Sequence, residues 1–133
     1  MVRKIASVIA GLACFAAVSG MLSLLATHAW PAYAAAYPHR AYTMAMLIVR
    51  LTAGVVAIVC AAALTAALAE QRRPAALWLG ITLLAISLPW HIHIWKQYPA
   101  WYHLFWFASL IPTALLGERL LRMSQAGPRS RPA

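Results

Sequence analysis

The sequence has almost no acidic residues. Of its 133 residues only Glu70 and Glu118 carry a carboxylate side chain, and both lie near the ends of apolar segments. Proton-coupled pumps and small multidrug exporters depend on carboxylates inside the membrane. A Ser-His-Asp triad likewise needs a carboxylate to orient its histidine. The scarcity of acids therefore argues against these classes, and we expect no enzymatic activity.

Cysteine and the common metal-binding motifs are also scarce. Cys14 and Cys60 lie inside apolar segments, where cysteine usually serves as a small packing residue. The sequence contains no HExxH or CxxC pattern and no zinc-finger or helix-turn-helix signature. The net charge of +9 is thus not accompanied by a nucleic-acid-binding motif. We expect no nucleic-acid partner.

Charged residues of either sign are few, whereas apolar residues dominate the chain. They make up 10% and 64% of the sequence, and soluble domains carry roughly 25% charged residues. Each of four apolar runs can cross a bilayer core about 30 Å thick, at residues 5–27, 42–69, 74–95 and 99–121. The sequence predicts an all-α fold, a four-span transmembrane helical bundle over residues 1–123. We expect residues 124–133 to form a disordered basic tail.

The basic residues are distributed unevenly between the two sides of the predicted bundle. Eight lie on one side: Arg3, Lys4, Arg72, Arg73, Arg119, Arg122, Arg129 and Arg131. Only Arg40 and Lys96 lie on the other side. Loops rich in lysine and arginine stay in the cytoplasm. The pattern predicts cytoplasmic termini and, in a bacterium, a multi-pass protein of the inner (plasma) membrane.

Arg50 lies within the second span, on a helix face of small residues that continues through Ala53, Ala57 and Ala61. Small residues mark contact faces between membrane helices, so we expect this span to pack closely on the first and Arg50 to point into the bundle. Two interpretations remain open. Arg50 can contact an anion or lipid phosphate from outside, or it can extend to the outer interface with backbone carbonyls as partners.

All five histidines and most tryptophans and tyrosines lie on the predicted outer side. The turn between the third and fourth spans is short, so residues on either side of it have similar depths. We expect His93 and His103 to lie at one depth on adjacent helices, near His28 at the end of the first span. His91 is about 200° around the helix from His93, so the two cannot share a face.

These residues form a candidate ligand-binding site. It comprises His28, Arg50, His91, His93, Trp95, Trp101 and His103. The first interpretation is a belt of interfacial side chains that positions the hairpin. The second is a pocket for a quinone or a lipid headgroup. The third is a haem or metal site, with His93 and His103 as ligands. No motif indicates a particular cofactor, and we predict none.

The last third of the sequence, at residues 99–102, 110–112 and 116–120 (PAWY, LIP and LGERL), resembles the closing helix of small uncharacterised bacterial four-helix inner-membrane proteins. The resemblance implies a four-helix inner-membrane fold and no particular activity. We expect an accessory, assembly or scaffold role, either as a homo-oligomer or as a subunit of a larger membrane complex. The lipid bilayer is the main expected partner. The alternative is a bundle that binds a haem, metal, quinone or lipid headgroup at the outer leaflet.

Overall fold

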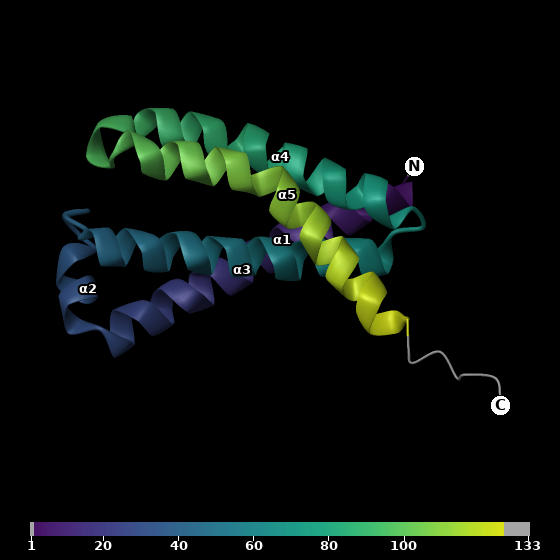
Figure 1. Ribbon diagram of the computed structural model, residues 1–133, viewed down its shortest axis with the longest axis horizontal. Helices are drawn as coiled ribbons and strands as arrows, with labels where there is room; N and C mark the ends of the chain where they lie inside the picture. The colour runs from purple at the N-terminus through teal and green to yellow at the C-terminus, as the bar shows by residue number, and fades with distance from the viewer. Residues whose placement is uncertain (1, 127–133) are drawn as a thin grey trace.

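A computed structural model describes residues 2–126 (Figure 1). All regular structure in this part is helical: α1 (Val2–Ala29), α2 (Pro31–Ala36), α3 (Met44–Leu68), α4 (Arg72–His93), the 3-10 helix η1 (Trp95–Gln97) and α5 (Ala100–Gln125). Helices α1, α3, α4 and α5 are long and apolar enough to cross a membrane. The predicted all-helical fold with four long apolar helices is confirmed.

The helix ends lie within a few residues of the predicted spans, and local chemistry explains where they fall. Thr43 precedes α3, and its hydroxyl accepts a hydrogen bond from the backbone N–H of Met46 at 3.4 Å, which satisfies one free donor of the first turn. Helix α5 continues to Gln125, past the predicted end at 121. Of the predicted tail, residues 127–133 lie outside the described residues.

Helix α3 lies at the centre of the bundle and packs against α1, α4 and α5. Helices α4 and α5 form an antiparallel hairpin (Figure 1). Figure 1 also shows that α1 diverges from this hairpin toward the end of the bundle that carries α2. We call this end the α2 end, and the opposite end, where α1 begins and α5 finishes, the terminal end.

Small residues allow the central helices to approach closely. Ala57, Ala61 and Thr65 of α3 are completely buried. A Cβ on Gly117 of α5 would lie 2.6 Å from the carbonyl oxygen of Val59, so that position has no room for a side chain. The contact predicted between the first two spans is present as the packing of α1 on α3.

The short helix α2 lies in the segment between the first two predicted spans, for which the sequence analysis gives no helix. Pro31 occupies its first turn, and Trp30 before it is extended. Proline fits this position because the first helical N–H groups have no partner within the helix. Six residues are too few for a clear helical periodicity. The helix buries Tyr33, which is 1% exposed, against the α2 end.

Candidate functional site

Arg50 lies between helices at the α2 end and is surrounded by tyrosines. Its Nη1 donates hydrogen bonds to the hydroxyl oxygens of Tyr33 at 3.2 Å and Tyr42 at 3.3 Å. Its guanidinium carbon lies 4.8 Å from the centroid of the Tyr42 ring. Its Nε is buried without a hydrogen-bond partner among the described residues. The guanidinium therefore has neutral partners, and they are tyrosine hydroxyls rather than backbone carbonyls.

The tyrosines around Arg50 form a connected cluster. The ring centroids of Tyr33 and Tyr42 are 5.4 Å apart, those of Tyr42 and Tyr98 are 6.0 Å apart, and those of Tyr98 and Tyr102 are 5.1 Å apart. Burial raises the pKa of Tyr42 to about 12, although the charge of Arg50 opposes this shift. Burial also raises the pKa of Tyr98. These two phenols stay neutral at physiological pH, so they do not supply a counter-charge for Arg50.

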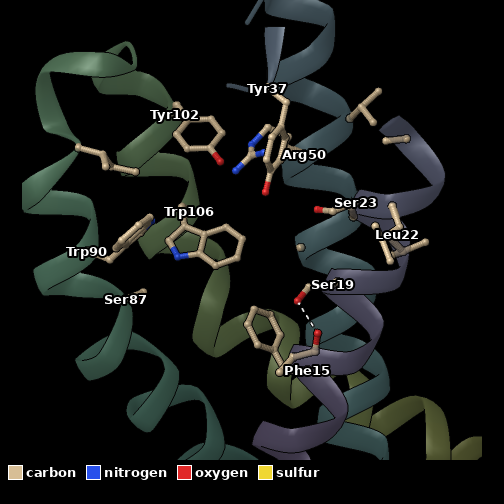
Figure 2. A pocket seen from close by; sticks show the side chains of 18 of the residues that line it. Phe15, Ser19, Leu22, Ser23, Tyr37, Arg50, Ser87, Trp90, Tyr102 and Trp106 are labelled. Carbon is tan, nitrogen blue, oxygen red and sulfur yellow. Dashed lines mark hydrogen bonds between the residues drawn. The ribbon is translucent and has the colours of Figure 1, made fainter. Parts of the chain in front are cut away.

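A large cavity opens beside Arg50, where α1 diverges from α4. Its volume is about 840 Å³, and its lining is mostly apolar. Figure 2 shows Arg50 and Tyr102 near one another at one end of this cavity, with Phe15 and Ser19 of α1 further along it. Trp106 projects into the space between the helices. We call this space the lateral cavity.

A second, smaller cavity at the α2 end also borders Arg50. Its volume is about 310 Å³, and it is lined by Arg40, Arg50 and several aromatic residues. Nη1 of Arg40 donates a hydrogen bond to Oε1 of Gln97 at 2.6 Å. The Arg40 guanidinium carbon also lies 5.5 Å from the centroid of Trp90. Arg50 therefore lines both cavities, and we call the smaller one the arginine cavity.

Two histidines meet inside the α4–α5 hairpin. Nδ1 of His91 lies 2.8 Å from Nδ1 of His103. His103 is completely buried and stacks on Trp95 with ring centroids 4.5 Å apart. A zinc ion bound by two imidazoles would hold their nitrogens at about 2.0–2.1 Å from the metal, which requires a wider separation. The two Nδ1 atoms therefore share a hydrogen rather than a metal ion.

The partner of His103 differs from the one expected from the sequence, because His91 faces it and His93 does not. Leu79, Leu83 and His91 are spaced by four and eight residues and lie on one buried face of α4. His93 is the last residue of α4 and is exposed. The expectation assumed that depth alone decides the pairing, whereas the helix face that packs on α5 decides it.

The remaining candidate residues fall into two groups. His91 lines the lateral cavity together with Arg50, and Trp95 covers His103, so these four lie near one another. His28 and Trp101 are exposed, as is His93. Within residues 2–126, no three His, Cys, Asp or Glu side chains gather closely enough to hold a metal ion.

Sequence reasoning did not single out the tyrosines that contact Arg50 or Trp106 beside it. The sequence does contain one indication that tyrosines contact Arg50, namely the lack of a carboxylate near it. An arginine cannot lose its charge, and the chain has only two carboxylates, neither near residue 50 in sequence. The neutral acceptors expected at the same depth are the tyrosine hydroxyls, which gather at this end of the chain's helices.

The chain matches no protein-family model, no curated protein and no solved structure at a significant level of similarity. What the protein can bind is therefore inferred from the two cavities and the residues that line them.

Proposed function

We propose that this protein is a four-span protein of a bacterial inner membrane with both termini in the cytoplasm. The support is the excess of basic residues in the termini and the 70–73 turn of the sequence, eight against two in the other segments, and the tendency of such segments to remain in the cytoplasm. In this orientation the α2 end, with both cavities and the histidine pair, faces the periplasm and the outer leaflet.

We propose further that the protein binds one amphipathic molecule in the lateral cavity. The observation that carries this proposal is a cavity of about 840 Å³ that is mostly apolar and has Arg50 at one end. Ligand-binding cavities usually have volumes of about 300–1,000 Å³, apolar walls and a few polar groups that fix orientation. Residues of both α1 and α4 line the cavity, and in this proposal an apolar chain enters between these helices from the lipid.

The ligand in this proposal is a lipid-like or quinone-like molecule rather than a haem. The Nδ1 atoms of His91 and His103 are engaged with one another at 2.8 Å, and Nε2 of His103 is enclosed by protein atoms. Apolar walls beside a single cation favour an amphipathic ligand instead. An accessory or assembly role in a larger membrane complex agrees with such binding, and this role and the lack of enzymatic activity remain predictions.

Gly20 of α1 provides a direct test. It lines the lateral cavity, and a Cβ at this position would have no heavy atom within 4 Å. The substitution Gly20→Phe therefore places a large side chain at the cavity wall, at a position where a Cβ meets no neighbour. Met21 is 55% exposed and does not line the cavity, so Met21→Phe adds the same ring on the outside as a matched control.

The measurement is native mass spectrometry of the purified full-length protein, with identification of co-purified lipids in an organic extract. We expect the wild type and Met21→Phe to retain about one molecule per chain, and Gly20→Phe to lose it. Equal retention by Gly20→Phe and the wild type would show that the lateral cavity is not the binding site.

A further inference from the structure

We propose that the arginine cavity binds a phosphate-type oxyanion between Arg40 and Arg50, as the headgroup of the molecule whose apolar part occupies the lateral cavity. The inference rests on the proposed function for the apolar part and adds the chemical class of the headgroup. It depends on four observations about charge and hydrogen bonding in the described residues.

The first observation is that the charge of Arg50 is not compensated. Its contacts are two tyrosine hydroxyls at 3.2 and 3.3 Å, and its Nε has no hydrogen-bond partner in the described part of the chain. A buried guanidinium that cannot lose its proton is costly unless it meets an anion or many acceptors. The described side chains around Arg50 therefore leave its charge for an anion to neutralise.

The second observation is that a second guanidinium lines the same small cavity. Arg40 comes from the loop between α2 and α3, and it borders the cavity of about 310 Å³ together with Arg50. Its partners are the neutral Gln97 amide and the face of Trp90. Two cations that line one small space repel one another. An anion between them removes this repulsion, and guanidinium groups match the geometry of phosphate oxygens.

The third observation is that both carboxylates of the chain form ion pairs with arginines at the terminal end. Glu70 forms an ion pair with Arg3 at 3.4 Å, and Glu118 forms one with Arg122 at 3.7 Å. Neither lines the arginine cavity. The anion that neutralises Arg40 and Arg50 is therefore expected to come from a ligand rather than from a side chain of this protein.

The fourth observation concerns the other polar groups of the cavity. Tyr37, Tyr42 and Tyr98 also line it. Burial raises the pKa of Tyr42 to about 12 and raises that of Tyr98, so both keep their hydroxyl hydrogens and can donate them. The cavity thus offers cationic and neutral donors without an acidic acceptor. This set suits a phosphate and does not suit a metal cation.

The test is a titration of the full-length protein in detergent, read by the tryptophan fluorescence of Trp90 and Trp106 beside the cavities. The probes are dioctanoyl phosphatidic acid, dioctanoylglycerol with the same chains but no phosphate, and inorganic phosphate. The variants are Arg40→Gln and Arg50→Gln. The matched control is Arg73→Gln, because Arg73 is exposed at the start of α4, at the terminal end.

We expect phosphatidic acid to bind the wild type and Arg73→Gln at least about tenfold more tightly than dioctanoylglycerol, since a charge-assisted hydrogen bond contributes on this order. Arg40→Gln and Arg50→Gln should each reduce that preference about tenfold. If Arg50→Gln does not fold, Arg40→Gln alone tests the oxyanion site, because Arg40 lies in a loop outside the core.

The remaining outcomes separate this inference from the proposed function. Binding of inorganic phosphate with the same dependence on Arg40 supports the oxyanion site and identifies a free anion as a possible source. Equal binding of both lipids, unaffected by either arginine variant, overturns the oxyanion inference while the lateral cavity keeps its proposed role. Absence of binding by all three probes overturns the oxyanion inference, and the Gly20→Phe experiment then decides the lateral cavity separately.

Discussion

His91 and His103 face one another across the α4–α5 hairpin with their Nδ1 atoms 2.8 Å apart. One ring must donate and the other accept, so the pair contains one shared hydrogen. Nε2 of His103 is buried and has no partner within residues 2–126. A buried polar pair that is only partly satisfied contributes little net stability. Its consequence is instead to favour the register in which His91, rather than His93, meets α5.

The histidine pair can be tested with aromatic replacements that preserve ring stacking. His91→Phe leaves both nitrogens of His103 buried without a partner, and we expect it to lower the free energy of unfolding by about 1–3 kcal/mol. The double variant His91→Phe/His103→Phe removes both polar groups and should recover most of this loss. Unfolding of the three proteins in detergent micelles gives the comparison. A loss of stability in the double variant larger than that in His91→Phe would contradict this account of the pair.

Tyr42 should make stability depend on pH in the alkaline range. Its pKa is about 12 in the folded protein, against an ordinary value of 10.0, so folding favours the neutral phenol. The resulting stabilisation is fully present below pH 10, and it is lost as the pH rises from about 10 through about 12. Absorbance at about 295 nm, the phenolate band, should show a late-titrating phenol near pH 12 that is missing in Tyr42→Phe. A phenol that titrates near pH 10 at this position would contradict its burial.

Much of the fold could be predicted from local properties of the sequence. The lengths of the apolar runs predicted four long helices, and the small residues along α3 predicted its contact with α1 and the inward position of Arg50. The pairing of His103 depends on which face of α4 packs against α5. That face is marked by Leu79, Leu83 and His91, whereas depth along the hairpin does not distinguish the face of His91 from that of His93.

The lateral and arginine cavities were beyond the reach of sequence reasoning for a different reason. They exist because α1 diverges from α4 and because α2 covers the bundle end with Tyr33. Both features depend on the relative placement of helices that are far apart in the sequence. Composition indicated an aromatic and histidine-rich region at this end, but it did not indicate that Arg50 lies between two spaces.

Helix packing through glycine predicts opposite effects at two positions. A Cβ on Gly117 would lie 2.9 Å from Cβ of Ala62, in addition to its contact with the Val59 carbonyl. We expect Gly117→Ala to destabilise the protein by about 1–3 kcal/mol, the usual cost of overpacking. Gly20→Ala should be neutral or stabilising by up to about 1 kcal/mol, because alanine favours a helix and nothing obstructs it there. Thermal unfolding in one detergent measures both, and equal effects would contradict the packing.

Gly54 and Trp106 connect helix packing to the lateral cavity. A Cβ on Gly54 would collide with the six-membered ring of the Trp106 indole, and Trp106 lines the cavity beside Arg50. We expect Gly54→Ala to displace this indole into the cavity, reduce the amount of co-purified ligand and shift the tryptophan emission. Phenylalanine is smaller than tryptophan, so Gly54→Ala/Trp106→Phe should restore space for the ligand.

Native mass spectrometry and fluorescence of the single and double variants measure this coupling. Trp106→Phe alone serves as the control for loss of the indole, and we expect it to retain the ligand because it enlarges the cavity. If Gly54→Ala binds ligand like the wild type, the indole has moved away from the cavity. If Trp106→Phe alone abolishes binding, the indole contacts the ligand directly.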